Sequence, residues 1–509
     1  MTGEHAIGFN LWRASDALRD VMEPQIRSEC LLALFFLKYV SDLERDRVES
    51  TTPRFFVPRD ASFDGLVQLS GTPGNAARVS AALLGLERAN PEKLRRLFSD
   101  LKWGPSESPE SGAFDKALGS AMKILGSPEL DLRPSRVREG QVAEAFEYIV
   151  ATFPAVSSYP GELYTPPEVS NLMAQLVDPR PGDSIYDPVC GSGGLLMACA
   201  GLLQARHNSR EYAIRGQEIN PWSWRLAKLN AFMNGEDGHR IECGDTLRNP
   251  LHVQGNALEQ FDAIVANPPF SLPYQEWEEA MTHDRFDRFN RGRPPRGRAD
   301  YAFILHMVAS MRPETGRIVT VAPHGVLFRG GGEAGIRRSL IESNLLDAVI
   351  GLPPKLFYAT GIPTAVLCFR AKREDDRVLL IDASRGFAAG RQRNELRRED
   401  IERIVTALRQ RASVPGYASM VSREQIADNG FTLNISRYIS PTREEPRVDS
   451  QTLAQRQKEL GVELGVTRDG IEALLQRLAP ECLTGGSVTG GVGSERVRWI
   501  RRTARTGAA

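Results

Sequence analysis

The sequence has no excess of either charge, and it has no apolar run long enough to cross a membrane. Its 509 residues include 64 lysines and arginines against 64 aspartates and glutamates. A grip on nucleic acid must therefore come from local basic patches or from a partner. The longest apolar run, at 31–37, is far below the about 20 residues of a membrane span, and no charged-then-apolar signal segment opens the chain. We expect a cytoplasmic protein that makes no membrane contact.

Cysteine and histidine are also scarce. The six cysteines, at 30, 190, 199, 243, 368 and 482, form no Cys-x-x-Cys pair, and the seven histidines form no cluster with the spacing of metal ligands. We expect no structural metal and reduced, packed cysteines, with Cys190 acting as a small neutral residue rather than a nucleophile. The hydrophobic content of 41% is ordinary for globular proteins, and the length suggests about three domains.

The pattern of apolar residues divides the chain into three parts. Residues 1–150 are helix-rich: apolar residues recur with helical spacing from Leu11 to Met22, and 30–40 is apolar almost all round apart from Lys38, as in a buried helix. In 151–440, short apolar strands alternate with helical stretches. Residues 441–509 contain a polar-amphipathic helix at 449–478, with a break near 461–465, and end in a stretch from 484 that is rich in Gly, Ser and Arg and that we expect to be disordered.

The strands of the middle part predict its architecture. They lie at 184–187, 212–217, 240–243, 261–266, 316–322, 346–350 and 364–369. Seven strands of this kind, alternating with helices, indicate an α/β fold with a doubly wound, mostly parallel sheet. In such sheets ligands bind at the carboxyl ends of the strands.

A glycine turn follows the first of these strands. The strand ends at Asp187, and Gly191, Ser192, Gly193 and Gly194 lead into an apolar helix. Glycines let the backbone approach a ligand closely, and a helix N-terminus favours polar or anionic groups. The order of residues differs from the Gly-x-Gly-x-x-Gly fingerprint, which weakens a nicotinamide interpretation. An acidic residue at the strand end suits a cofactor with a positively charged sulfonium and an amino group.

Two more acidic residues lie at the ends of the next strands. Glu218 ends the second strand, where a carboxylate could accept hydrogen bonds from both hydroxyls of a ribose, as in related sheets. Asp245 follows the third strand and is placed to meet the adenine amine of the same cofactor. Each acid alone is typical of a solvated loop, but three at successive strand ends predict a cofactor crevice.

The tetrapeptide Asn267, Pro268, Pro269 and Phe270 directly follows the fourth strand. Its plain interpretation is a proline-stiffened turn. An exocyclic amine such as adenine N6 is a poor nucleophile, so a site that methylates it must accept both amine hydrogens. Asn267 offers its side-chain oxygen and Pro268 its carbonyl, because Pro269 confines Pro268 to extended conformations. Phe270 offers an aromatic face to a base rotated out of its stack.

These motifs together resemble those of the S-adenosylmethionine-dependent adenine-N6 DNA methyltransferases, and among them the modification (methylase) subunit of type I restriction-modification systems. Segments 351–357 and 360–364 resemble those that follow the catalytic core of these subunits, and 11–42 resembles their helical N-terminal domain. A further loop looks like the one that closes over the methionine end of the cofactor. It consists of Glu162, Leu163, Tyr164, Thr165, Pro166 and Pro167.

The resemblance implies a fold and a division into domains. The fold is a Rossmann-like methyltransferase sheet of seven strands with an all-α N-terminal domain and a helical C-terminal tail. The helical domain would span 1–150 and contact DNA or a partner. The methyltransferase domain would span 151–440, and a C-terminal extension at 441–509 would pack on a helix of another subunit.

The resemblance also implies a function. S-adenosyl-L-methionine would lie against the closing loop, the glycine turn, Glu218 and Asp245, and the residues from Asn267 to Phe270 would catalyse direct methyl transfer to a flipped adenine of double-stranded DNA. We find no long region after residue 440 that could read a target sequence. A separate specificity subunit, with two copies of this chain, and a restriction subunit are therefore the expected partners.

An arginine-rich segment lies between the fourth and fifth strands. It contains Arg285, Arg288, Arg291, Arg293, Arg296 and Arg298. The segment has too much Gly, Pro and charge for regular structure, and a charge run is usually a solvated surface. Because it closely follows the tetrapeptide, we predict a mobile loop that grips DNA phosphates around the flipped base and orders on binding.

Other functions are compatible with parts of this pattern. A stand-alone adenine-N6 DNA methyltransferase, or one from another phage-defence system, would share the cofactor and base motifs. A protein-glutamine methyltransferase also uses Asn-Pro-Pro followed by an aromatic residue, although the helical N-terminal part and the arginine segment argue against it. A non-catalytic assembly or DNA-binding subunit would not need the intact set of motifs.

Overall fold

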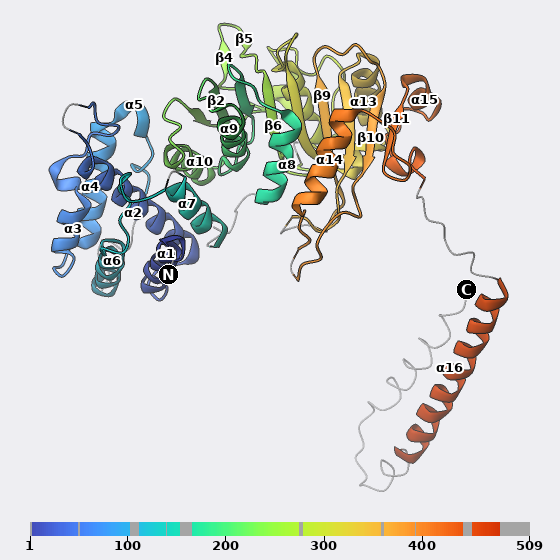
Figure 1. Cartoon of the computed structure of the whole chain (residues 1–509), viewed down its shortest axis with the longest axis horizontal. Coiled ribbons are helices and arrows are strands. Elements are labelled where there is room, and N and C mark those ends of the chain that lie inside the picture. Colours follow the sequence, from blue (N-terminus) through green and yellow to red (C-terminus); the bar gives the residue numbers. More distant parts are fainter. Residues whose placement is uncertain are drawn as a thin grey trace. The chain divides into compact units, whose positions relative to one another are not determined.

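The structure is a computed structural model that describes residues 3–48, 51–101, 111–138, 140–152, 165–273, 278–357, 361–391, 393–440 and 450–478. The chain divides into two compact units, Met1–Pro441 and Thr442–Ala509. Figure 1 shows the first unit as a helical region followed by a sheet covered with helices. Among the described helices, none combines the length and the hydropathy that a membrane crossing requires.

The helical region is built around one buried helix. Its elements are α1 (Gly3–Ala17), α2 (Pro24–Arg45), the 3-10 helix η1 (Arg59–Ala61), α3 (Phe63–Leu69), α4 (Asn75–Ala89), α5 (Pro91–Leu94), α6 (Ser111–Leu125) and α7 (Gln141–Thr152). Residues 30–40 of α2 are all buried, so the prediction of a helix buried all round is confirmed. Lys38, only 3% exposed, forms an ion pair with Asp42 one turn further along α2. The pairing compensates a charge that burial alone would make costly.

A nine-stranded sheet follows. Its strands are β1 (Ser184–Asp187), β2 (Ala213–Glu218), β3 (Arg240–Cys243), β6 (Ala263–Ala266), β7 (Arg317–Pro323), β8 (Leu346–Gly351), β9 (Thr364–Arg370), β10 (Val378–Asp382) and β11 (Ala418–Val421). Their order is β11-β10-β8-β9-β7-β6-β1-β2-β3. β9 and β11 are antiparallel to their neighbours, and the other pairings are parallel. A separate two-stranded ribbon joins β4 (Val253–Gln254) and β5 (Ala257–Leu258).

The predicted α/β class and the predominantly parallel sheet are confirmed, and the seven expected strands are present. The count of seven was wrong, because β10 and β11 extend the sheet. β10 follows the charged stretch 372–377, which hides the start of its apolar run. β11 is a short strand at the edge of the sheet and has two half-buried residues, so its apolar alternation is weak.

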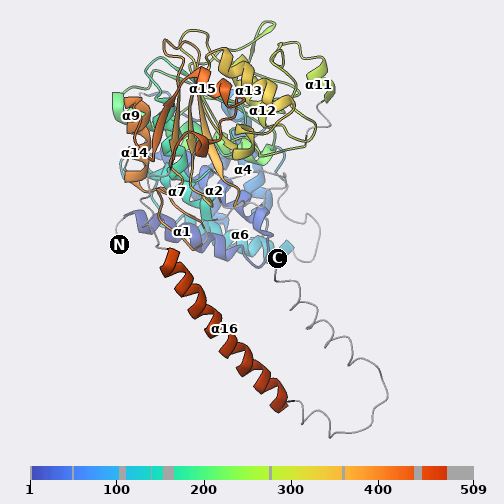
Figure 2. The ribbon, with the colours of Figure 1, turned by 90° about the vertical axis from the view of Figure 1, so that its right-hand side faces the viewer.

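Helices cover both faces of the sheet. Those whose apolar residues share one core are α8 (Pro167–Val177), α9 (Gly194–His207), α10 (Pro221–Met233) and α14 (Arg398–Gln410). The opposite core contains residues of α11 (Glu278–Thr282), α12 (Asp300–Ala309), α13 (Gly332–Glu342), α15 (Arg423–Asp428) and the 3-10 helices η3 (His324–Leu327) and η4 (Ile435–Arg437). In Figure 2 the sheet lies between α9 and α14 on the left and α12 and α13 on the right. This is the doubly wound arrangement that the sequence predicted.

Helix α10 belongs to two hydrophobic cores. Trp222, Leu226 and Phe232 pack in the core of the helical region, together with α2 and α4. On its other side, Ala227 and Ala231 pack in the core of the sheet. The helical region and the sheet therefore share one helix, although sequence places α10 well inside the predicted methyltransferase domain.

The parallel strands bring their carboxyl ends to one edge of the sheet. β1 pairs with β2 on one side and with β6 on the other, so the strand order reverses between β1 and β6. Ligands of open α/β sheets bind at such a reversal. Asp187 ends β1 and Asn267 follows β6, so the two predicted chemical motifs lie at neighbouring strand ends.

In the second unit, α16 (Ser450–Leu478) is one continuous helix. The predicted break near 461–465 was therefore wrong. Each of Gly461 and Gly465 costs about 1 kcal/mol relative to alanine in a helix. The surrounding Leu, Gln, Glu, Lys and Arg residues are strong helix formers and outweigh that cost. The stretch from 484, predicted to be disordered, lies outside the described residues.

Candidate active site

Asp187 is a buried carboxylate at the end of β1. Its side chain is only 1% exposed, and Oδ1 accepts a hydrogen bond from the Val189 backbone N–H at 2.9 Å. Burial raises the pKa of Asp187 well above its ordinary value, and the negative charge of Glu218 adds to the rise. Within the described part of the chain, no cationic side chain forms an ion pair with Asp187. A carboxylate in this position favours a cationic ligand.

The glycine turn packs directly on α10. Gly191 and Gly193 have positive φ angles of +52° and +80°, which a side chain would strain. A Cβ added to Gly193 would lie 3.3 Å from the Cα of Ala227 in α10. Nothing lies within 4 Å of a Cβ added to Gly191. Gly194 begins α9, so the predicted order of strand, glycine turn and helix is present.

Glu218, at the end of β2, holds the same turn from the neighbouring strand. Its Oε2 accepts the Gly191 N–H at 2.9 Å, and its Oε1 accepts the Asn220 N–H at 2.7 Å. The side chain is 6% exposed. Glu218 thus holds the glycine turn through its carboxylate.

Asp245 follows β3, the next strand along this edge. Its Oδ1 accepts the backbone N–H groups of Leu247 and Arg248 at 2.9 and 3.1 Å. The hydroxyl of Thr246 donates to the Pro188 carbonyl at 2.5 Å, which ties this segment to the residues after β1. The structure therefore brings the ends of β1, β2 and β3 together, as the sequence predicted.

The turn that follows β6 meets the predicted closing loop. The amide Nδ2 of Asn267 donates to Thr165 Oγ1 at 3.0 Å. Pro166 caps the helix that begins at Pro167. Glu162, Leu163 and Tyr164 lie outside the described residues.

An aromatic pair borders this turn. The rings of Phe270 and Phe357 are 6.1 Å apart between centroids and meet edge to face at 82°. Phe357 is 3% exposed and lies in the segment 351–357 that follows β8. Phe270 is half-buried. The sequence analysis assigned Phe357 to a segment that resembles one of the family, but it did not predict the contact with Phe270.

The backbone after Phe270 is fixed by a buried acid. Ser271 has a positive φ of +50°, which is uncommon for a residue with a side chain. Its N–H donates to Asp300 Oδ1 at 2.8 Å, and Asp300 is 4% exposed. Asp300 Oδ2 and Glu333 in turn accept from Arg329, at 3.1 and 2.9 Å. Asp300 therefore holds the tetrapeptide against the loop that follows β7.

A family model described as N-6 DNA Methylase matches residues 138–447. The chain belongs to the N-6 DNA methylase family. A second model, described as the HsdM N-terminal domain, matches residues 7–109 and so covers most of the helical region.

Individual relatives agree. The methylase subunit of the type I restriction enzyme MjaIX of Methanocaldococcus jannaschii is 26% identical over 519 residues, covering 92% of this chain and 89% of that protein. The MjaVII methylase subunit of the same organism is 32% identical over 339 residues, or 64% of this chain. The match spans 57% of that relative's length. A solved type I restriction-modification methyltransferase subunit from Streptococcus thermophilus has a TM-score of 0.74 and 26% identity, covering 86% of this chain and 100% of that one. The resemblance to type I modification subunits is confirmed.

The arginine-rich segment of this N-6 DNA methylase is irregular, as predicted, but Arg288 does not face solvent. It is 3% exposed, and its guanidinium donates to the carbonyls of Thr246 and Leu247 at 3.1 and 2.8 Å. It also forms an ion pair with Asp284 at 2.9 Å. The prediction that Arg288 contacts DNA was therefore wrong: its donors are used inside the protein, where they fix the segment next to Asp245.

Arg288 also reaches a buried polar pair behind β1. The Nη1 atom of Arg288 lies 3.3 Å from Nδ1 of His306. On the other side of the ring, His306 Nε2 lies 3.1 Å from the hydroxyl oxygen of Tyr186. Burial lowers the pKa of His306 well below its ordinary value, and the charge of Arg288 lowers it further. A neutral His306 can accept from Arg288 and donate to Tyr186. The pair therefore connects β1 to the segment after β6.

The other arginines of the segment differ in exposure. Arg291 donates to the hydroxyls of Ser339 and Ser343 at 3.1 and 2.6 Å, and Arg296 pairs with Glu278 at 2.6 Å. The exposed members are Arg285, Arg293, Arg296 and Arg298.

No local signal marked two further residues of this family member. Asp300 lies in the first turn of α12, and Asn230 lies in α10 with 1% exposure. Asn230 donates to the carbonyl of Ser192 in the glycine turn at 3.1 Å. Both residues act on the site through contacts between distant segments. In the described residues, no three or more His, Cys, Asp or Glu side chains gather as metal ligands would.

Proposed function

We propose that this protein is the modification subunit of a type I restriction-modification system and methylates N6 of a flipped adenine in DNA, with S-adenosyl-L-methionine as methyl donor. One observation carries the proposal. The acidic glycine turn at Asp187 and the tetrapeptide that begins at Asn267 follow β1 and β6, which are adjacent parallel strands. A donor held by the first motif and a base held by the second would lie side by side.

The residues around the glycine turn fit the donor. The buried Asp187 carboxylate complements an ammonium or sulfonium charge, which would offset the cost of its own burial. Glu218 ends β2, where its carboxylate would accept from the ribose hydroxyls, and Asp245 follows the neighbouring strand β3, where it would meet the adenine amine. Gly191 leaves room for close approach, because an added Cβ would have no neighbour within 4 Å. When bound, the sulfonium supplies an activated methyl group, so no covalent enzyme intermediate is required.

The tetrapeptide would position the base. Asn267 Oδ1 and the Pro268 carbonyl would accept the two N6 hydrogens and stabilise positive charge as it develops on nitrogen. The bond from Asn267 Nδ2 to Thr165 Oγ1 would hold the amide next to the closing loop. Pro269 restricts the backbone of Pro268, and Phe270 with Phe357 would provide an aromatic wall for the purine. Catalysis is then mainly positioning.

Contacts with the DNA backbone would come from exposed arginines near this turn. We propose Arg285, Arg293, Arg296 and Arg298 for this role, since their side chains are accessible. The helical domain, which we propose to span 1–150, would contribute further contacts with DNA or with a partner.

The C-terminal extension, which we propose to span 441–509, would bind another subunit. Leu460, Leu464, Thr467 and Ile471 recur in α16 at alternating spacings of four and three residues, as at the a and d positions of a coiled coil. The apolar members are 49%, 74% and 54% exposed. We propose that this stripe packs on a helix of the specificity subunit, with two copies of this chain per specificity subunit and a restriction subunit joining for cleavage.

The decisive experiment measures methyl transfer and donor binding on the same variants. We expect Asn267→Ala to reduce transfer of a labelled methyl group to DNA by at least about a hundredfold, as losses of transition-state hydrogen bonds do elsewhere. Donor affinity, measured by calorimetry, should stay within a factor of about two, because Asn267 belongs to the base site. Asn75→Ala, a buried asparagine of the helical region, is the matched control. Near-normal turnover of Asn267→Ala would refute the assignment.

The same assay separates the competing functions. We expect the isolated chain to bind the donor but to methylate DNA weakly, and the chain co-expressed with a specificity subunit to methylate defined adenines. Efficient site-specific methylation by the isolated chain would indicate an autonomous enzyme. Labelling of protein rather than DNA would indicate a glutamine methyltransferase.

A further inference from the structure

The glycine turn is supported from behind by α10. Ala227, fully buried, faces Gly193 so closely that an added Cβ would lie 3.3 Å from its Cα. Asn230 lies almost one helical turn further along and is 1% exposed. Its Nδ2 donates to the carbonyl of Ser192, the residue between Gly191 and Gly193, at 3.1 Å. The backbone of the turn is therefore held by a side chain that does not belong to it.

The second donor hydrogen of Asn230 is directed to the helical region. Nδ2 donates to Glu147 Oε1 in α7 at 2.9 Å. Asn230 Oδ1 accepts from Asn234 Nδ2, also at 2.9 Å. A carbonyl and a carboxylate can only accept, so the group between Ser192 and Glu147 must carry two hydrogens. An amide nitrogen meets this requirement, and a carboxylate of the same shape does not.

The helical region also fixes the position of α10 itself. Leu226, Leu229 and Phe232 pack in its core, beside α2 and α4. Just after the helix, Asp237 is held by Arg54 through both carboxylate oxygens, with a shortest contact of 2.6 Å, and by Lys93 at 3.0 Å. Any shift of the helical region would therefore move α10, and with it Asn230 and Ala227.

We infer that Asn230 is a positioning residue for the donor site, through which the helical region takes part in binding S-adenosylmethionine. The inference rests on the proposed function. A turn with two glycines in left-handed conformations has little side-chain packing of its own, so its geometry depends on external contacts. Asn230 supplies such a contact, and it joins the turn to α7 in the same side chain.

The test compares donor binding and turn protection in the full chain. We expect Asn230→Ala to weaken S-adenosylmethionine binding by about tenfold in calorimetry, the effect of losing about one buried hydrogen bond. Amide hydrogen exchange of the peptide containing Gly191 and Gly193 should increase without ligand. Asn75→Ala is the matched control, because Asn75 is also 1% exposed and donates to two carbonyls, those of Ser70 and Asp115, at 3.0 and 2.9 Å. It should leave both readouts unchanged.

A second pair of variants separates positioning from stability. Asn230→Asp places a carboxylate against the Ser192 carbonyl and the Glu147 carboxylate, so we expect a lower Tm and weaker donor binding. Adding Glu147→Gln supplies a donor to that carboxylate, so the Tm should recover. The affinity should stay low, because the Ser192 carbonyl still faces an acceptor. Recovery of affinity together with the Tm would show a purely structural role and overturn the inference.

The outcomes also separate this inference from the proposed function. A wild-type chain that binds no S-adenosylmethionine overturns both. Normal binding by the wild type and by Asn230→Ala, with unchanged hydrogen exchange of the turn, overturns the role of Asn230 alone. Weakened binding with faster exchange in Asn230→Ala, and neither change in Asn75→Ala, supports both.

Discussion

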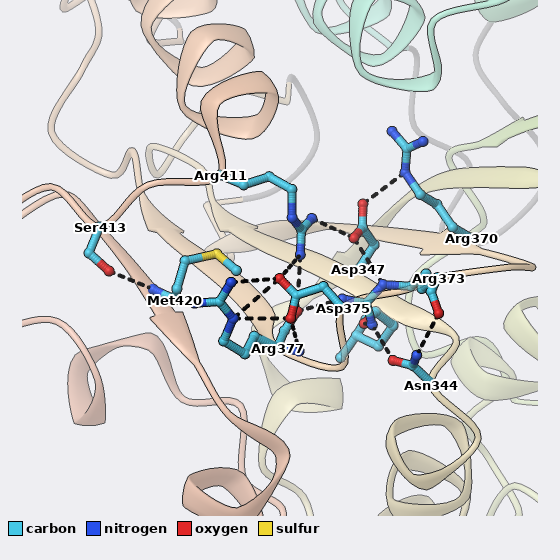
Figure 3. Close-up of polar contacts among 10 residues, drawn as sticks. Asn344, Asp347, Arg370, Arg373, Asp375, Arg377, Arg411, Ser413 and Met420 are labelled. Carbon is cyan, nitrogen blue, oxygen red and sulfur yellow. Dashed lines mark hydrogen bonds and ion pairs between the residues drawn. The ribbon is translucent and has the colours of Figure 1, made fainter.

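At the carboxyl edge of the sheet, Asp187 is held by a backbone N–H, whereas at the amino edge Asp347 is surrounded by guanidinium groups. Both residues are nearly inaccessible, at 1% and 2% exposure. Asp347 lies near the start of β8, where the strand is irregular, and it contacts Arg370, Arg373 and Arg411 at 2.9, 3.1 and 2.6 Å. Figure 3 shows these three arginines around the one carboxylate: Arg370 and Arg373 come from the end of β9 and the residues after it, and Arg411 from the end of α14.

The same contrast recurs along the two edges. At the amino edge, Asp183 pairs with Arg317, and Asp262 pairs with Arg312 at 2.8 Å. These acids connect the starts of strands to the segments beside them. At the carboxyl edge, Asp245 accepts its hydrogen bonds from backbone N–H groups of the residues that follow it.

The difference shows how a fold separates stability from function. A buried carboxylate with several cationic partners has its charge compensated within the protein, so it contributes to the structure and has little left for a ligand. A buried carboxylate without such partners keeps an uncompensated charge, and a raised pKa is the result. Substitution of the acid at the amino edge should therefore lower the stability and leave donor affinity unchanged, whereas substitution of the acid at the carboxyl edge should lower donor affinity and leave the stability unchanged or higher.

The largest expected effect is a loss of stability at the amino edge. Asp347→Asn should lower the free energy of unfolding by about 3 kcal/mol, because it leaves buried Arg373 and its neighbours without their anionic partner. Scanning calorimetry would measure the fall in Tm, and donor affinity below the transition should be unchanged. Glu342→Gln is the control, since the pair of Glu342 with Arg338 is exposed at 47% and 60% and should contribute less than about 0.5 kcal/mol. A fall in Tm no larger than that of the control would contradict the distinction between the two edges.

At the carboxyl edge, Asp187→Asn should have the reverse pattern. The substitution keeps the shape and the acceptor for the Val189 N–H but removes a buried charge. We expect donor affinity to fall by at least about tenfold, or roughly 1.4 kcal/mol, while the Tm without ligand stays the same or rises. Because the folded-state pKa of Asp187 is raised, its ionised form costs stability increasingly as pH rises, so any gain in Tm should be larger at pH 8 than at pH 5. A loss of Tm like that of Asp347→Asn would show that Asp187 is structural.

The two candidate motifs could be predicted from the sequence because the residues of each motif follow one another along the chain. The turn from Asp187 to Gly194 and the tetrapeptide from Asn267 to Phe270 each contain their donors, acceptors and backbone constraints within a few residues. Strand alternation then placed both motifs at strand ends, and the parallel sheet brought those ends together. The placement of both motifs at neighbouring strand ends was therefore predictable from residue types and spacing.

Contacts between distant segments were not predictable in this way. Arg288 looked like its exposed neighbours, yet its carbonyl partners Thr246 and Leu247 are 42 and 41 residues away. In the sequence, Asn230 cannot be told from any other polar residue of a helix. Its role depends on a hydrogen bond to Ser192, which lies 38 residues earlier in the chain. The continuity of α16 was missed for another reason: glycine propensity was given more weight than the helix formers around it.

Exposed arginines of the arginine-rich segment test whether the contrast also holds at the surface, between charges that have an acidic partner and charges that could bind a ligand. Replacing Arg285, Arg293 and Arg298 with alanine together should lower duplex DNA affinity of the assembled complex. Its salt dependence should also fall, by about one unit of slope for each phosphate that is no longer neutralised. Fluorescence anisotropy over a range of salt concentrations would measure both. The control removes three exposed arginines that have acidic partners, Arg338, Arg377 and Arg398. An equal change in both triple variants would mean that only total charge matters.

The smallest expected effect is the pH dependence of donor binding. Asp187 has a raised pKa, so as pH falls it becomes protonated earlier than an ordinary aspartate and attracts a cationic ligand less. The dissociation constant for S-adenosylmethionine should therefore increase as pH falls, by a few-fold, beginning above the ordinary range of aspartate titration near pH 4. Methylthioadenosine has neither the ammonium nor the sulfonium group, so its binding should depend less on pH. Asp187→Asn should remove the difference between the two ligands. If the difference persisted in that variant, another group would be titrating, and the uncompensated charge at the carboxyl edge would have to be assigned elsewhere.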